Sequence, residues 1–242
     1  MNDTNQQTMA EWTIMVYLAA DDILANFAIE SLKQLRRSAG RDIVVAAQLD
    51  VDGPFARQKL RRFIFDGLRN EDAKIDDDVV ERLDPRTNMI DPKTLTAFIK
   101  WVYTQPRCKA KRHCLILWGH GPELLAEPAP AGKSPKLKAP VAGGSKGLYL
   151  TPPQLRQALE SAQTGRQQPM FEIVGLDACS SSIVEIASEL RTYAQFMVAS
   201  QEDVPDMSFP YQRLLQRFRT SEVFCRCVGH SVKRASRKDA RQ

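Results

Sequence analysis

A histidine and a cysteine each follow a short apolar run of the kind that forms a buried strand. His120 lies between two glycines after the run Cys114–Trp118, and Cys179 comes soon after the run Ile173–Leu176. A cysteine thiolate is a strong nucleophile, and an imidazole can activate it and protonate a leaving group. These two residues predict nucleophilic catalysis if the fold brings them together.

The two apolar runs predict where the pair would meet. Both are unbroken and bounded by turn-forming residues, which is typical of parallel strands covered on both faces. Neighbouring parallel strands end at the same sheet edge, where ligands bind in open α/β folds. If these strands are neighbours, His120 and Cys179 emerge side by side. We also expect a helix to follow Cys179 directly, so that its N-terminus favours the thiolate.

The alternative interpretation of the cysteines is structural. A free cysteine is usually a small buried hydrophobic residue, which suits Cys108 and Cys114. The neighbours of Cys179 are instead an acid and three serines. Near the C-terminus there are three possible zinc ligands, Cys225, Cys227 and His230. They lack a fourth ligand and the usual spacing, which disfavours a zinc site. We expect no metal site.

The apolar pattern alternates between strands and helices, which predicts one α/β domain with a mostly parallel sheet and helices on both faces. Strands are expected over residues 12–19, 42–50, 114–118, 170–177 and 195–200, with a β-ribbon over 58–67. Helices are expected over 24–40, 91–102, 151–162, 183–190 and 209–218. The segment 70–90 is expected to be mostly loop.

The domain boundaries follow from composition. A chain of 242 residues suits one large domain, which we assign to residues 12–218. Residues 1–11 are polar and expected to be disordered. Residues 122–147 are rich in proline and lysine without apolar periodicity, which predicts a flexible insertion. Residues 219–242 form a basic C-terminal tail.

Charge and cysteine content exclude several classes of protein. The net charge is +5, but the last twelve residues carry five basic residues against Asp239, so the folded body is almost neutral and nucleic-acid binding is disfavoured. No apolar stretch is long enough to span a membrane. Five cysteines without a visible export signal predict reduced thiols and a cytoplasmic location.

Four stretches together resemble the clostripain-type cysteine peptidases, members of the caspase, legumain and gingipain clan. They are WTIMVYLAADDIL, LILWGHG, VGLDACSSSIVEIASEL and FMVASQEDVPDMSFPY, in the same order and with similar spacing as in that family. The resemblance implies a caspase-hemoglobinase-like α/β/α sandwich. It also implies a cysteine endopeptidase acting on protein or peptide substrates, with no cofactor expected and a calcium requirement left open.

The resemblance also assigns roles to individual residues. His120 would be the general acid and base, and Cys179 the nucleophile. Asp177 would line the primary specificity pocket, which implies cleavage after Arg or Lys; its alternative role is to cap the following helix. The other pocket wall would contain Ser200, Gln201, Asp203 and Asp206. The amides of Gly121 and Cys179 are candidates for the oxyanion hole.

Two departures from the family pattern bear on regulation and substrate fit. Pro122-Glu123-Leu124 follows the His-Gly pair, and this unusual sequence could block substrate. The alternative function is therefore a catalytically silent interaction module of the same fold. The family's Gly-Trp-Pro-Tyr appears as residues 208–211, Ser-Phe-Pro-Tyr.

The insertion 122–147 leaves the predicted catalytic edge directly after His120. A long loop can lie across a cleft at small entropic cost. We therefore expect zymogen-like activation by cleavage in this loop, by the protein itself or by an upstream activating protease. The favoured bond is Lys146–Gly147, just before regular structure is expected to resume.

Overall fold

The computed structural model describes most of the predicted domain. The described residues are 9–20, 24–51, 60–67, 74–121, 141–143, 148–163, 165, 169–205 and 209–219. The Lys146–Gly147 bond, Asp206, and nearly all of the predicted terminal segments 1–11 and 219–242 therefore lie outside the described residues. No helix in the described ranges is both long enough and apolar enough to cross a lipid bilayer.

A seven-stranded, mostly parallel sheet forms the centre of the fold, in the order β4-β3-β2-β1-β5-β8-β9. Its strands are β1 (Ala10–Ala20), β2 (Ile43–Val51), β3 (Leu60–Phe65), β4 (Val79–Arg82), β5 (Ala110–Trp118), β8 (Phe171–Asp177) and β9 (Ala194–Ala199). The pairs from β2 through β1, β5 and β8 to β9 are parallel, whereas β3 and β4 add an antiparallel ribbon at one edge.

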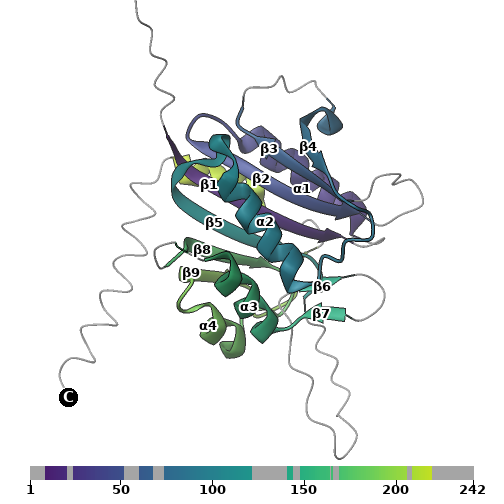
Figure 1. Cartoon of the computed structure of the whole chain (residues 1–242), viewed down its shortest axis with the longest axis vertical. Coiled ribbons are helices and arrows are strands. Elements are labelled where there is room, and N and C mark those ends of the chain that lie inside the picture. Colours follow the sequence, from purple (N-terminus) through teal and green to yellow (C-terminus); the bar gives the residue numbers. More distant parts are fainter. Residues whose placement is uncertain are drawn as a thin grey trace, which may run out of the picture.

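Helices cover both faces of this sheet. Helices α2 (Pro92–Thr104), α3 (Pro152–Ala162) and α4 (Val184–Leu190) pack on the face turned to the viewer in Figure 1, with α1 (Ala25–Ser38) and α5 (Tyr211–Arg219) behind it. The predicted α/β/α sandwich is therefore confirmed, and all five predicted helices form.

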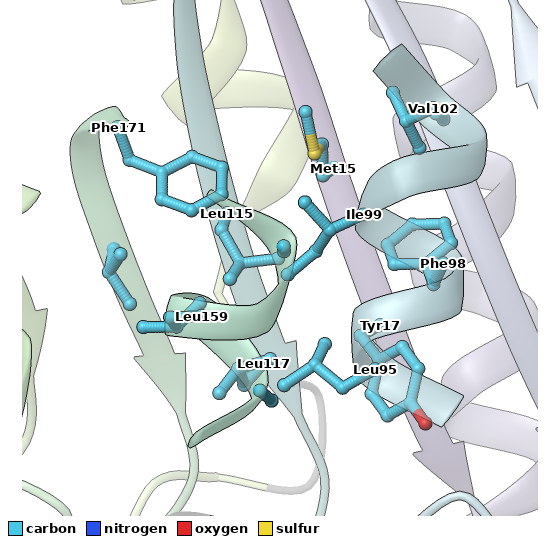
Figure 2. Packing of buried hydrophobic residues seen from close by; sticks show 14 of the residues in the cluster. Met15, Tyr17, Leu95, Phe98, Ile99, Val102, Leu115, Leu117, Leu159 and Phe171 are labelled. Carbon is cyan, nitrogen blue, oxygen red and sulfur yellow. The ribbon is translucent and has the colours of Figure 1, made fainter. Parts of the chain in front are cut away.

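Alternating residues of the strands build one apolar core on each face. In Figure 2, Met15, Tyr17, Leu115 and Leu117 of the sheet pack against α2 and α3. The intervening residues of the same strands face α1 and α5 in the second core. Because β1 and β5 are buried on both faces, their apolar runs are nearly continuous, as expected for central parallel strands.

Two predicted helix starts form with the capping groups that the sequence provides. The Asp91 carboxylate accepts a hydrogen bond from the Lys93 amide at 2.9 Å, with proline in the first turn. Thr151 and Gln154 make a reciprocal capping box at the start of α3. Both helices are thus fixed locally before they pack on the sheet.

Two regions contain more regular structure than their composition predicted. Residues 70–90, expected to be mostly loop, include a 3₁₀ helix at Ile75–Asp78 and the edge strand β4. Within the expected insertion, β6 (Val141–Gly143) pairs antiparallel with β7 (Leu148–Leu150), so regular structure resumes before Thr151. The elements in both regions are only three or four residues long, so they do not depend on a long apolar pattern.

Candidate active site

The sheet register brings the two predicted catalytic residues to one edge. Strands β5 and β8 are parallel neighbours, and their last residues, Trp118 and Asp177, are register partners. The Gly119 amide extends this pairing by donating to the Asp177 carbonyl at 3.4 Å. His120 and Cys179 follow at equivalent positions beyond the two strands, and both side chains are partly exposed.

His120 and Cys179 line the same pocket. Side chains alternate between the two faces of the sheet along β5 and β8. The pocket lies on the face that α1 and α5 cover, because Trp118 and Leu24 belong to the apolar core on that face. The lining residues are Leu24, Trp118, Gly119, His120, Asp177, Ala178, Cys179, Val204 and Pro205. The pocket thus combines a thiol, an imidazole and a carboxylate with apolar walls, as expected for a site that binds and transforms a ligand.

The main chain of Gly121 lies directly against that of Cys179. A Cβ atom at residue 121 would come within 1.9 Å of the Cys179 carbonyl oxygen and 2.6 Å of the Cys179 nitrogen. Only glycine allows this approach, since any side chain would overlap with the backbone. The two residues predicted to form the oxyanion hole are therefore neighbours in space.

The turn after Cys179 differs from the prediction. Helix α4 begins at Val184, so the thiol does not lie at a helix N-terminus, and that part of the prediction was wrong. Instead, Ser180 has a φ of 47°, in the left-handed region. The hydroxyl of Ser181 is fully buried and donates to the Ala178 carbonyl at 2.8 Å. A strained turn held by a buried hydroxyl thus presents the thiol.

The segment 200–205 runs beside this turn and is bonded to it. The Ser182 amide donates to the Ser200 carbonyl at 2.8 Å, and the Ser180 amide donates to the Glu202 carbonyl at 3.0 Å. The Val204 amide donates to Cys179 Sγ at 3.3 Å, and the thiol contacts the Val204 carbonyl at 3.7 Å. The main chain of this segment therefore holds the Cys179 thiol.

Of the predicted residues of the second pocket wall, Ser200 contributes through its backbone carbonyl. Among the described residues, the pocket lining does not include Ser200, Gln201 or Asp203, and the last two are exposed. Val204 and Pro205 line it instead. The sequence offered no chemical signal for these two, because both are apolar and neither belongs to a periodic pattern.

Asp177 is buried and anchors the chain that follows β9. Its side chain is 3 % exposed. Its Oδ2 accepts hydrogen bonds from the Tyr211 hydroxyl at 2.6 Å and from the Phe209 amide at 3.1 Å. These bonds join β8 to the start of α5, and they differ from the alternative role of capping the helix after Cys179. Sequence reasoning missed Tyr211, whose signal was its place in the Ser-Phe-Pro-Tyr stretch.

The other described cysteines are buried, and their thiols ionise less readily than usual. Burial raises the pKa of the Cys108 thiol to about 12 and raises the pKa of Cys114 well above its usual range. Both stay protonated near neutral pH. Of the cysteines in the described residues, only Cys179 is partly exposed.

Metal ligands do not gather in the described part of the chain. Across residues 9–219, leaving aside the ranges not described, no group of three or more His, Cys, Asp or Glu side chains could hold a metal ion.

Comparison with known proteins finds one matching family and solved structures of similar fold. A sequence model of the clostripain family matches residues 16–229. No curated protein gives a significant match.

Two solved structures are similar to the chain. The first is a secreted C11 cysteine protease from Bacteroides thetaiotaomicron, in complex with an irreversible peptide inhibitor. It shares 22% identity at a TM-score of 0.61, covering 86% of this chain and 53% of that one. The second is an inactive zymogen C11 protease from Parabacteroides distasonis, with 21% identity at a TM-score of 0.61, covering 85% and 52%. The chain spans about half the length of these proteins, and the likeness supports the fold.

Proposed function

This chain belongs to the clostripain family, and we propose that it is a cysteine endopeptidase with Cys179 as nucleophile and His120 as general acid and base. One observation carries the proposal: the parallel pairing of β5 and β8 delivers both side chains into one pocket. Its substrates would be proteins or peptides, as for the cysteine proteases with the same fold.

In the proposed reaction, Cys179 Sγ bonds to the scissile carbonyl carbon while its proton passes to His120. His120 then gives the proton to the leaving nitrogen as the C–N bond breaks, which leaves a thioester on Cys179. Water attacks the thioester carbon and gives one proton to His120. The acyl product leaves as a carboxylic acid, and the proton returns to the thiolate.

The proposed oxyanion hole consists of the Gly121 and Cys179 amides. The direct approach of the two main chains supports it, since two amides close together can stabilise the negative charge on one tetrahedral oxygen. The bond from the Val204 amide would help to hold Sγ beside them.

Cleavage after Arg or Lys is proposed to depend on Asp177. This carboxylate lines the same pocket as the dyad and is almost fully buried. In such a site, a charge-assisted hydrogen bond to a cationic side chain contributes roughly 1.5 to 3 kcal/mol. The other wall is proposed to be the segment 200–205, through Val204 and Pro205.

Regulation by cleavage in the 122–147 loop belongs to the same proposal. The contact between the thiol and the Val204 carbonyl supports a resting state, because the thiol proton must be released from this carbonyl before Sγ attacks substrate. A zymogen among the similar structures also supports it. Cleavage would fall at Lys146–Gly147 or at another lysine of the loop, namely Lys133, Lys136 or Lys138.

Mass spectrometry of purified wild type and Cys179→Ala separates the two routes of activation. Self-cleavage predicts a cut wild type and an intact variant, whereas an upstream protease predicts the same cut in both. If a variant with all four loop lysines changed to alanine stays intact and matches the initial rate of wild type, the loop is not a switch.

The dyad is tested with a small peptide reporter that ends in arginine. Cys179→Ala and His120→Ala should each lower kcat/KM by at least about a thousandfold while the circular dichroism spectrum stays folded. Cys114→Ala is the matched control, because it removes a buried thiol from β5 outside the pocket. Wild-type rates in either dyad variant would contradict the proposed mechanism.

A further inference from the structure

The Asp177 carboxylate is held by the first residue of α5 and by the chain just before this helix. The Tyr211 hydroxyl and the Phe209 amide both donate hydrogen bonds to the same oxygen, Asp177 Oδ2. The hydroxyl contact of 2.6 Å lies in the range of a charge-assisted O–H···O⁻ bond, which is stronger than a neutral one. With Oδ2 fixed at two points, the carboxylate has little freedom to rotate.

The group that supplies the hydroxyl is itself held rigidly. Tyr211 is fully buried and is the first residue of α5. The same helix buries Leu215 and Phe218 in the core facing α1, and the Phe218 ring packs edge-on against Trp12. The hydroxyl therefore occupies a position set by helix packing on the sheet.

The far end of α5 is anchored as well. The Arg219 guanidinium donates to the carbonyls of Ser38 and Ala39 at 2.7 and 3.0 Å. These carbonyls lie at the C-terminal end of α1, where cationic donors are favourable. Because α5 is fixed at both ends, a shift of the Tyr211 hydroxyl would require the whole helix to move.

We propose that Tyr211 is a positioning residue for substrate specificity, whose hydroxyl holds the Asp177 carboxylate in the orientation that receives a guanidinium or ammonium group. This inference rests on the proposed role of Asp177 in the pocket. Tyr211 does not touch the substrate; it acts through Asp177. A guanidinium binds a carboxylate through directed hydrogen bonds, so recognition depends on the angle of the carboxylate as well as on its charge.

Removal of the hydroxyl should affect charged and neutral substrates differently. In Tyr211→Phe the ring still fills the core, but the carboxylate loses its shortest hydrogen bond and gains rotational freedom. A substrate with citrulline, the neutral near-isostere of arginine, forms no ion pair with Asp177. The variant should therefore lose selectivity for arginine over citrulline and keep most of its activity on the neutral substrate.

The experiment compares kcat/KM for matched peptides with arginine or citrulline before the cut. Tyr211→Phe should reduce the arginine preference by at least about tenfold, equal to about 1.4 kcal/mol. The matched control is Tyr17→Phe, which removes another buried hydroxyl, bonded to the Met89 carbonyl at 2.7 Å in the opposite core. It should leave the preference unchanged, even if both variants melt at lower temperatures.

A double-mutant cycle with Asp177→Asn separates positioning from general damage to the fold. If Tyr211 acts through Asp177, Tyr211→Phe should cause no further loss of preference when Asp177→Asn is already present. An arginine preference in Tyr211→Phe equal to that of Tyr17→Phe would overturn the inference. An additional loss in the double variant would do so as well.

Binding measurements keep failure of the proposed reaction distinct from failure of this inference. In the Cys179→Ala background, the affinities of the arginine and citrulline peptides can be compared by NMR titration without any turnover. If wild type cleaves neither peptide but Tyr211→Phe still weakens arginine binding selectively, the positioning role stands and the peptidase assignment fails. If Asp177→Asn does not change the preference, the pocket assignment and this inference both fail.

Discussion

Trp118 and Asp177 are register partners at the ends of two parallel strands, and each is followed two residues later by a reactive side chain, His120 or Cys179. The relative position of the two reactive groups is therefore set by backbone hydrogen bonds of the central sheet. Their chain segments are separated by the 122–147 loop, so a cut in that loop leaves both strands in the same sheet. The proposed activation by cleavage is compatible with this arrangement.

Gly121→Ala should nearly abolish peptidase activity. The added methyl group would lie 1.9 Å from the Cys179 carbonyl oxygen, so the two main chains must separate. Loss of one oxyanion-hole donor typically lowers kcat by about 100-fold to 1,000-fold. The control is Gly175→Ala in β8, where a Cβ would meet Ile116 at an ordinary 3.4 Å. Similar kcat values for the two variants would exclude Gly121 from the site.

Ser180→Gly and Ser180→Val should have opposite effects on stability. At a φ of 47°, glycine is unstrained, whereas a β-branched side chain is strongly disfavoured. We expect Ser180→Gly to be neutral or stabilising, and Ser180→Val to lower the free energy of unfolding by roughly 1 to 3 kcal/mol. Urea denaturation measures both. Equal stability of the two variants would mean that residue 180 is not left-handed in solution.

The strands around the site could be predicted from the sequence because strands buried on both faces require uninterrupted apolar runs. The runs Cys114–Trp118 and Ile173–Leu176 are apolar without interruption, since both faces of β5 and β8 are covered. The conformation of the turn between Cys179 and α4 could not be predicted in the same way. The left-handed turn at Ser180 is bonded to the Glu202 carbonyl, which lies far along the chain.

Alkaline pH should destabilise the protein through its buried thiols. Burial raises the folded-state pKa of Cys108 to about 12 and raises that of Cys114 further, whereas an unfolded cysteine ionises near pH 8.5. The stabilisation is complete below the unfolded pKa and is lost as the pH rises toward the folded pKa. At about pH 10.5, each thiol should have lost roughly 2 to 3 kcal/mol of its contribution.

Cys114→Ala provides the control for this pH dependence. The gap in unfolding free energy between wild type and variant should narrow by roughly 2 to 3 kcal/mol between about pH 7 and about pH 10.5. Urea denaturation in the presence of a reductant measures the gap at each pH. A gap that does not change with pH would show that Cys114 ionises equally in the folded and unfolded states.

The contact between Asp177 and Tyr211 illustrates what a local pattern does not contain. In sequence, the Ser-Phe-Pro-Tyr stretch differs from the family's Gly-Trp-Pro-Tyr motif and does not indicate a partner for its phenol. Its phenol reaches the strand β8 because α5 folds back across the sheet and packs against α1. Long-range contacts of this kind follow from the assembly of the layers, so a sequence motif can mark the residue without identifying its partner.

Covalent labelling with an electrophile tests the proposed nucleophile most directly. Wild type and Cys179→Ala are incubated with an arginine-ended peptide that carries an acyloxymethyl ketone, and peptide mapping then locates the label. The account predicts one label per wild-type molecule, on Cys179, slower labelling in His120→Ala, and no label on Cys108 or Cys114. A wild type that remains unlabelled, or a Cys179→Ala variant labelled to the same extent, would contradict it and favour a silent module of the same fold.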